Sequence, residues 1–316
     1  MEWWEIGWIV LGALLAATLA LALGFFFKIF FAVRRKSQKG AGIALPSSDE
    51  YEVHREQIRA WAREVREMPH TDVSIRSLDG LTLWGSYYEC KKGAPIEILF
   101  HGYRGTAFRD MSGGVIRCFA RGRNALVVDQ RAAGRSEGHV ITFGARESLD
   151  CRAWVDFVIE KIDPDAKIIL TGISMGAATV MQAASMEMPQ NVVAVLADCG
   201  YTSTREIVKK VIRDMHLPAH LLYPFVRLGA ILFGHFDPDR DSPIASMKRC
   251  CIPVIFFHGD ADGFVPCRMS EENHAACASA HKKLIVIPGA EHGLCFPVDR
   301  ETYLAELDAF LKPYLS

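Results

Sequence analysis

The chain starts with one long apolar run and continues with a series of short ones. No charged residue occurs between Ile6 and Phe27, and Ile29 to Val33 extends the run beyond Lys28. As a helix, this run is long enough to cross a hydrocarbon core of about 30 Å. We therefore predict one N-terminal transmembrane helix, within an anchor of residues 1–36. The alternative is a buried helix of a soluble domain, but such helices rarely lack charges over this length.

The residues that flank the run favour an anchor over a secretory signal peptide. A signal peptide has a basic start, a shorter apolar stretch and a cleavage site of small residues. Here Glu2 and Glu5 come first, the tryptophans nearby suit a membrane interface, and the basic residues follow the run. These basic residues are Arg34, Arg35, Lys36 and Lys39. Because basic flanks remain in the cytoplasm, we expect the rest of the chain to be cytoplasmic.

Residues 37–70 read as a linker followed by a juxtamembrane helix. Glycine, proline and small residues dominate Ser37 to Pro46, and Ser47 to Glu50 fits a capping box. The charged helix that follows has a narrow apolar stripe of Ile58, Trp61 and Val65. We expect this helix to lie on the domain that follows it or on the membrane surface.

From Asp72 onward, short apolar runs alternate with helix-like segments. Two segments around Asp79-Gly80 predict a hairpin. The later runs are PIEILF, NALVVD, KIILTG, VVAVLAD, PVIFFHG and KLIVIPG, and helix-like segments such as 144–162, 175–188 and 267–280 separate most of them. The alternation predicts an α/β fold over residues 71–316, with a mainly parallel sheet, an antiparallel N-terminal edge and helices on both faces. Such sheets carry their active sites at the carboxyl ends of the strands.

Composition restricts the classes of partner. The 316 residues are 50% hydrophobic and 23% charged, so the chain can bury a sizeable core. A net charge of -1 gives no electrostatic reason to expect nucleic acid as a partner. The nine cysteines have neither zinc-type spacing nor an even count, which favours free, mostly buried thiols in a reducing compartment. We expect no metal and no cofactor.

Where the apolar run KIILTG ends, a serine lies between two glycines. The sequence there is Gly172-Ile173-Ser174-Met175-Gly176, and a helix-like segment follows it. A serine on a sharp strand-to-helix turn projects its hydroxyl above the sheet, and side chains at the two glycines would collide with the neighbouring strand and helix. The five-residue pattern alone is weak evidence. Its position at a strand-to-helix junction is what indicates a nucleophile elbow.

A serine nucleophile needs an acid and a base, which should follow it in that order. Asp262 lies in the loop after PVIFFHG, and His292 lies in the loop after KLIVIPG. His292 would take the proton of the Ser174 hydroxyl, and Asp262 would orient the imidazole and stabilise its cation. The backbone amides of Tyr103, after PIEILF, and of Met175 would stabilise the oxyanion.

Three other polar residues compete for roles in this site. Asp260 is the neighbouring carboxylate, and we expect it to bind backbone groups of its loop. Asp198, at the end of VVAVLAD, is a second rival for the acid. His101 is expected to brace the oxyanion loop rather than act as the base.

The segments HGYRG, DQRAAGRS, GISMG, HGDADGFVP and GAEHG occur in this order and together resemble the α/β-hydrolase superfamily. With the apolar run before them, the chain resembles the single-pass, membrane-anchored serine hydrolases of its esterase or peptidase-like branch. The resemblance runs from about Asp72 to the C-terminal end and implies the same triad and oxyanion donors. Members of the epoxide and haloalkane type are disfavoured, because they carry aspartate at the elbow. One departure is Ala132, which stands where relatives commonly have glycine.

Substrate choice should depend on residues 201–248, which we interpret as a small helical cap inserted in the hydrolase domain. This insertion is strongly apolar, and its side chains either pack the cap on the core or line an acyl-chain pocket. The expected activity is cleavage of a small-molecule or lipid-like carboxylic ester at the membrane, and thioesters and amides could follow the same acyl-enzyme route. The alternative is a catalytically silent fold that serves as a membrane-bound binding or scaffold protein.

Overall fold

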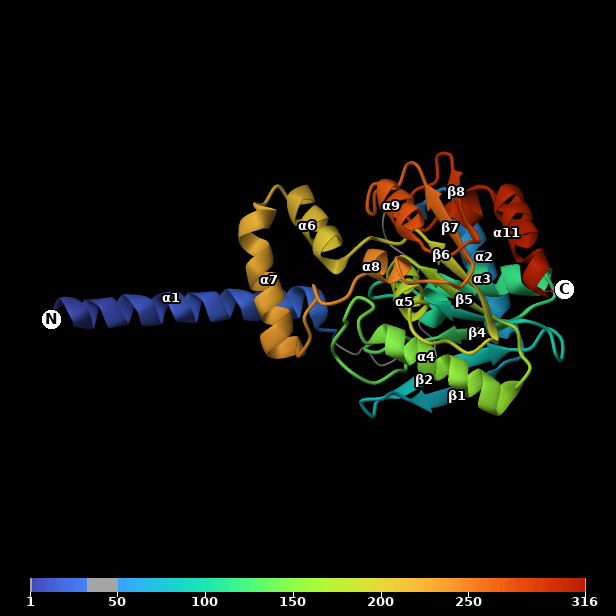
Figure 1. Ribbon diagram of the computed structural model, residues 1–316, viewed down its shortest axis with the longest axis horizontal. Helices are drawn as coiled ribbons and strands as arrows, with labels where there is room; N and C mark the ends of the chain where they lie inside the picture. Colours follow the sequence, from blue (N-terminus) through green and yellow to red (C-terminus); the bar gives the residue numbers. More distant parts are fainter. Residues whose placement is uncertain (1, 33–50, 316) are drawn as a thin grey trace.

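The computed structural model describes residues 2–32 and 51–315, and a single eight-stranded sheet of order β1-β2-β4-β3-β5-β6-β7-β8 forms its centre (Figure 1). The strands are β1 (Thr71–Arg76), β2 (Thr82–Tyr88), β3 (Ile96–Phe100), β4 (Asn124–Val128), β5 (Ile168–Ile173), β6 (Val192–Asp198), β7 (Val254–Gly259) and β8 (Lys282–Ile287). β1 and β2 form the predicted hairpin and β2 pairs antiparallel with β4, whereas the other neighbours are parallel. The predicted fold class is confirmed.

Helices cover both faces of the sheet. One face carries α4 (Glu147–Phe157) with its π-helical continuation η3 (Val158–Ile162), α5 (Met175–Ala183), α8 (Pro243–Met247) and α9 (Arg268–Ala276). The other face carries α2 (Arg55–Glu67), α3 (Ala107–Ala120), the short α10 (Cys295–Val298) and α11 (Arg300–Leu315). Because neither face meets water, the central strands are mostly apolar, and the charged exception, Glu97 in β3, is buried and paired with Arg117 and Arg123.

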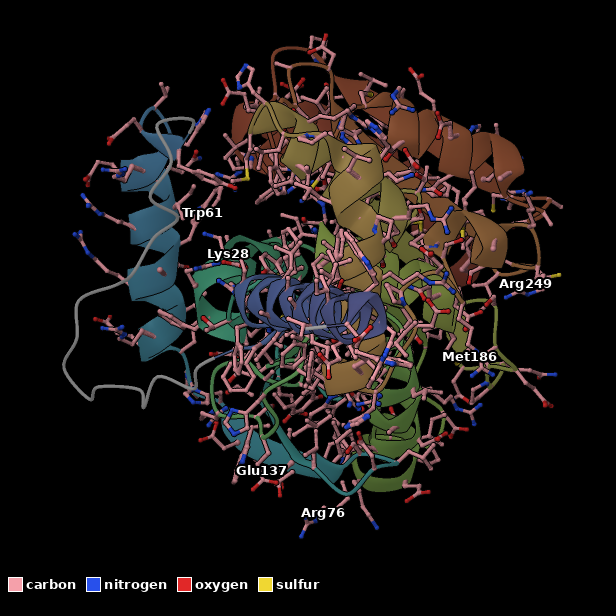
Figure 2. The ribbon with its side chains drawn as sticks, turned by 90° about the vertical axis from the view of Figure 1, so that its left-hand side faces the viewer. Lys28, Trp61, Arg76, Glu137, Met186 and Arg249 are labelled. Atoms are coloured by element: carbon pink, nitrogen blue, oxygen red, sulfur yellow. The ribbon has the colours of Figure 1, made fainter. Side chains whose placement is uncertain are left out.

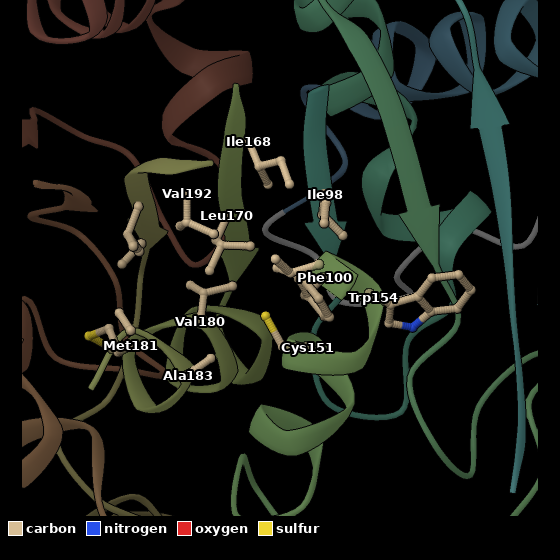
Figure 3. Close-up of a cluster of buried hydrophobic side chains, with 14 of the residues drawn as sticks. Ile98, Phe100, Cys151, Trp154, Ile168, Leu170, Val180, Met181, Ala183 and Val192 are labelled. Carbon is tan, nitrogen blue, oxygen red and sulfur yellow. The ribbon is translucent and has the colours of Figure 1, made fainter. Parts of the chain in front are cut away.

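The alternation of side chains along β3 shows how the two cores form. Ile98 and Phe100 are buried on the side of α4 and α5, whereas Leu99 between them packs against α3. Figure 3 shows the first of these cores, where Leu170 of β5 approaches Val180 of α5. This packing fixes α5 against the sheet and so fixes the turn that precedes it.

The N-terminal apolar run forms α1 (Trp3–Phe25), and the π-helical segment η1 (Phe26–Phe30) continues it. The helical run Trp3–Phe30 contains an 18-residue window with a mean hydropathy of 2.5 and is long and apolar enough to cross a membrane. In Figure 1 most of α1 projects away from the body, while its C-terminal end is docked on the body. The docking is by backbone hydrogen bonds, from Ala32 N to the His139 carbonyl and from Ile141 N to the Phe30 carbonyl, both 2.8 Å. The run is therefore one continuous element that ends on the body of the protein.

Residues 201–248 form α6 (Thr204–Asp214), α7 (Ala219–Gly234) and α8. α6 and α7 stand away from the sheet beside the end of α1, and α8 packs on α5 (Figure 1). Viewed along α1, α7 lies across that helix (Figure 2). The crossing is close: a Cβ at Gly229 would lie 2.3 Å from the Ala22 carbonyl oxygen. The cap therefore rests on the apolar N-terminal helix as well as on the sheet.

The charged helix expected after the linker is α2, and it lies on the body. Trp61 and Val65 are buried and Ile58 is partly buried, so the predicted apolar stripe faces the protein. The ring of Trp61 packs against Phe296, with centroids 5.3 Å apart, and Figure 2 shows it pointing inward from α2. The expected linker and capping box, residues 37–50, lie outside the described residues.

Candidate active site

Ser174 lies at the turn between β5 and α5, on a backbone with φ 56° and ψ -115°. A positive φ is strained for any residue other than glycine, and such strain marks a nucleophile elbow. Glycine is required on both sides of the serine, because any side chain there would collide with backbone atoms. A Cβ at Gly172 would lie 2.1 Å from the Gly176 carbonyl oxygen, and a Cβ at Gly176 would lie 2.0 Å from the Phe100 carbonyl oxygen. The turn is thus as tight as the glycine spacing predicts.

Two loops at the same edge of the sheet bring His292 and Asp262 to Ser174. The Nε2 atom of His292 lies 2.9 Å from Ser174 Oγ, and its Nδ1 atom lies 2.7 Å from Asp262 Oδ2. These are hydrogen-bond distances, so the three side chains form one chain from hydroxyl to carboxylate. The backbone that carries His292 is also held, because the Tyr51 hydroxyl donates to the His292 carbonyl oxygen at 2.8 Å. The structure thus places the three predicted residues together, in the order that proton transfer requires.

The carboxylate of Asp262 is buried but well supplied with donors. Its Oδ1 accepts from the backbone amides of Phe264 at 2.9 Å and Val265 at 2.7 Å. Burial alone would raise the pKa of Asp262, but hydrogen bonds from His258 and His292 outweigh burial and hold this pKa well below its usual range. The group therefore stays ionised and can stabilise an imidazolium.

A second buried histidine, His258, also contacts this carboxylate, and the sequence analysis did not single it out. Its Nε2 lies 3.1 Å from Asp262 Oδ2 and 2.8 Å from the Val265 carbonyl oxygen, while its Nδ1 lies 2.6 Å from the Ser270 hydroxyl. Its position in HGDADGFVP, at the end of an apolar run, was the available signal. The residue supports the Asp262 loop from within the core.

The two residues predicted as oxyanion donors, Tyr103 and Met175, lie in the loop after β3 and at the start of α5. A Cβ at Gly102 would lie 3.6 Å from the Ser174 Cβ, so this loop runs directly beside the serine. The Met175 amide is at the first position of α5, where no carbonyl of the helix is available to it. The Tyr103 side chain points away toward the N-terminal helix, where its hydroxyl donates to the Ile29 carbonyl oxygen at 2.7 Å.

The three residues that compete for roles in the site, Asp260, Asp198 and His101, form hydrogen bonds with other partners. Asp260 Oδ1 accepts from the Gly289 amide at 2.6 Å, which is the structural role expected for it. Asp198 is buried, which raises its pKa, and its Oδ2 accepts from the Tyr303 hydroxyl at 3.0 Å. His101 is fully buried and its Nε2 accepts from the Gln130 amide at 3.0 Å, so it braces the loop after β3.

One group within residues 2–32 and 51–315 has the spacing of a metal site: Cys199, Asp262 and His292, whose ligand atoms lie within 4.8 Å of one another. Two of its members already bind each other in the chain to Ser174. Burial raises the pKa of the Cys199 thiol well above its usual value, which disfavours the thiolate that a metal needs. The arrangement fits hydroxyl activation better than metal binding.

Two cavities meet at Ser174. The first, the histidine-side cavity, has a volume of about 250 Å³ and is lined by His292, Arg109 and Asp110 among others. The second, the cap-side cavity, has a volume of about 600 Å³ and lies between the Tyr103 loop, α6 and the C-terminal end of α1. The larger one is lined mostly by apolar side chains and has the size and character of a small-molecule site.

The comparisons with known proteins agree with this architecture. A family model described as the alpha/beta hydrolase fold matches residues 98–226. The uncharacterized protein YqkD of Bacillus subtilis is 27% identical over 191 residues, which span 60% of this chain and 62% of YqkD. The uncharacterized protein Rv2307c of Mycobacterium tuberculosis is 28% identical over 244 residues, which span 76% of this chain and 78% of Rv2307c.

Among solved structures, the esterase Pf2001 of Pyrococcus furiosus superimposes with a TM-score of 0.65 at 22% identity, covering 80% of this chain and 96% of the esterase. At 22% identity, this superposition shows a common fold and nothing more specific. The strand order, the strand-to-helix elbow, the family-model match and the superposition agree, and the chain is an α/β-hydrolase-fold protein.

Proposed function

We propose that the protein is a membrane-anchored serine hydrolase that cleaves carboxylic esters. The observation that carries this proposal is the hydrogen-bonded chain Ser174–His292–Asp262 at the wall of a mostly apolar cavity. The solved neighbour Pf2001 is an esterase, which supports the same class of reaction. Thioesters and amides would use the same acyl-enzyme route.

In the proposed reaction, Ser174 Oγ attacks the carbonyl carbon while its proton passes to His292 Nε2. The amides of Tyr103 and Met175 stabilise the negative oxygen of the tetrahedral intermediate, and Asp262 stabilises the imidazolium. When the intermediate collapses, the Nε2 proton passes to the departing alkoxide, which leaves as the alcohol. Water then repeats the sequence on the acyl-serine and releases the carboxylic acid.

The two cavities have different tasks in this mechanism. The leaving oxygen must be close to His292 Nε2 to receive its proton, and His292 lines the histidine-side cavity. The alcohol part of the ester therefore belongs there. The cap-side cavity, which also reaches Ser174, is left for the acyl chain.

The proposal is tested by reacting the full-length protein, in detergent micelles, with a fluorophosphonate that traps activated serines. We expect one labelled peptide, containing Ser174, and measurable turnover of 4-methylumbelliferyl butyrate. Absence of both labelling and turnover would reject the proposal and favour a silent binding or scaffold protein.

We predict that medium and long acyl esters are better substrates than acetyl esters. The apolar area that each added methylene buries in the cap-side cavity contributes about 0.8 kcal/mol, so kcat/KM should rise several-fold per step before the cavity is full. A series of 4-methylumbelliferyl esters from acetate to palmitate measures this. A flat or falling kcat/KM along the series would contradict the assignment of the cavity.

We also propose that α1 is a membrane anchor and that the hydrolase body is cytoplasmic, because the basic residues follow the apolar run. Of the nine cysteines, all within the described residues, Cys251 alone is exposed and can report topology. A membrane-impermeant maleimide should modify Cys251 only after cells are permeabilised. The Cys251→Ser variant is the control for the modified site. Labelling of Cys251 in intact cells would place the body on the outer side.

A further inference from the structure

The wall of the cap-side cavity includes a segment of the apolar N-terminal helix. Ala20, Leu21, Gly24 and Phe25 of α1, with Lys28 and Ile29 of η1, line the same cavity as Ser174. The spacing of these residues puts them on one face of a helix. A neighbouring face is formed by Ala22, Phe26 and Phe30, which are buried against the cap and the body. One face of the helix end therefore lines the cavity, and the neighbouring face packs against the cap and the body.

This helix end is held in place by polar contacts to the oxyanion loop. Besides the bond from the Tyr103 hydroxyl to Ile29, the Arg104 guanidinium donates to the carbonyl oxygens of Lys28, at 2.8 Å, and Phe31, at 3.2 Å. The helix ends at Phe30, so the carbonyls near its end have no amide of a following turn to bind and are available to Arg104. The wall is therefore fixed in position relative to Ser174.

A bilayer that α1 crosses from Trp3 onward would end close to where the cavity begins. From Trp3 to Leu21, α1 rises about 27 Å, which is close to the hydrocarbon thickness of about 30 Å. The part of α1 that lines the cavity starts at the end of this span. Lys28 and Arg104, the two charged side chains on the cavity wall, lie about 10 Å further along the helix, at the level of the polar headgroups.

The cavity rim is apolar and exposed. Leu21 is 41%, Met215 is 57% and Leu217 is 44% exposed, although all three line the cavity. On α7, which lies across α1, Leu221, Ile231 and Leu232 are also exposed. Side chains of this kind beside a membrane-spanning helix are those that a bilayer would cover.

We propose that the anchor helix forms part of the acyl-binding site, and that the substrate is a long-chain ester of the same bilayer whose acyl chain enters alongside α1. The rim faces lipid, the wall leads from the rim to Ser174, and the polar part of the ester stays at the level of Lys28 and Arg104. This inference rests on the proposed hydrolase activity.

Gly24 offers a direct test. It lines the cavity, and a Cβ built on it meets no atom within 4 Å, so a side chain added there starts in open space on the cavity wall. Gly12 of the same helix has equally open surroundings and does not line the cavity, which makes it the matched control. Full-length wild type, Gly24→Phe and Gly12→Phe are reconstituted in phosphatidylcholine vesicles. Their kcat/KM values for 4-methylumbelliferyl palmitate and butyrate are compared.

We expect the palmitate-to-butyrate ratio to fall at least tenfold in Gly24→Phe and to stay within twofold in Gly12→Phe. An unchanged ratio in Gly24→Phe, or an equal fall in both variants, would overturn the inference while leaving the hydrolase activity standing. Labelling by a small fluorophosphonate checks that each variant has folded, and Gly24→Val replaces Gly24→Phe if the larger change prevents folding. A wild-type protein that neither labels nor turns over would reject the proposed function and this inference with it.

Discussion

Ser174→Ala should abolish fluorophosphonate labelling and lower ester turnover by at least about ten-thousandfold, to the background rate. The change removes only a hydroxyl, whose hydrogen bond goes to His292 Nε2. The backbone at φ 56° is equally strained with alanine, so the fold and its melting temperature should change little. Turnover of 4-methylumbelliferyl butyrate by the purified protein, before and after labelling, measures the effect.

Ser185→Ala is the matched control for this experiment. Ser185 follows α5, and its hydroxyl donates locally to the Gln182 carbonyl oxygen at 2.9 Å. That variant should label and turn over like the wild type. If Ser174→Ala still reacted with the probe, another residue would be the nucleophile and the assignment of the elbow would be wrong.

The sheet and the elbow could be predicted from the sequence because both depend on short-range requirements. A strand covered on both faces is mostly apolar, which marks β3 to β7 as short apolar runs with few polar residues. The elbow needs glycine at two fixed positions, and the sub-3 Å distances at Gly172 and Gly176 show why. Both features leave a local mark in the sequence, although the atom that a Cβ at Gly176 would strike belongs to Phe100 of β3.

The role of the N-terminal helix could not be predicted in the same way. Leu21, Phe25 and Phe26 have side chains that suit lipid, a protein core and a cavity wall equally well. Which of these surrounds each residue depends on α6 and α7, which lie about two hundred residues away in the sequence. An apolar pattern indicates burial from water, but it does not identify the partner.

The departure at Ala132 has a local explanation. Ala132 has φ 61°, a left-handed backbone that glycine adopts without strain, which accounts for glycine being common there in relatives. Its amide donates to the Glu137 carbonyl oxygen at 2.9 Å and closes the loop. The residue has no hydrogen bond to the triad among these contacts, so the substitution affects the loop rather than the chemistry.

The choice of the acid illustrates where sequence order is insufficient. Asp198, Asp260 and Asp262 all follow apolar runs, and chain order alone allows any of them to precede His292. The structure distinguishes them by their partners: Tyr303 for Asp198, the Gly289 amide for Asp260 and the ring of His292 for Asp262. These contacts lead to a different expectation for each asparagine variant.

Asp262→Asn should lower kcat for ester turnover by about a thousandfold or more. Oδ1 of Asp262 accepts two backbone amides, from Phe264 and Val265, so the oxygen of asparagine will keep that position. Its amino group must then face His292 Nδ1 and donate to it. The proton of the neutral ring is thereby forced onto Nε2, which faces Ser174 Oγ and can no longer accept the serine proton.

Asp260→Asn and Asp198→Asn are the matched comparisons, since each replaces one carboxylate oxygen by an amino group at a neighbouring strand end. Asp260→Asn can keep an oxygen toward the Gly289 amide, and we expect kcat to fall no more than about threefold. Asp198→Asn removes a buried carboxylate that is bound to Tyr303, and its effect should be on the melting temperature rather than on kcat. Steady-state kinetics and thermal unfolding of the three variants separate these outcomes. A kcat that collapsed in Asp198→Asn and survived in Asp262→Asn would transfer the role of the acid to Asp198, because only the residue that sets the tautomer of His292 can have the thousandfold effect.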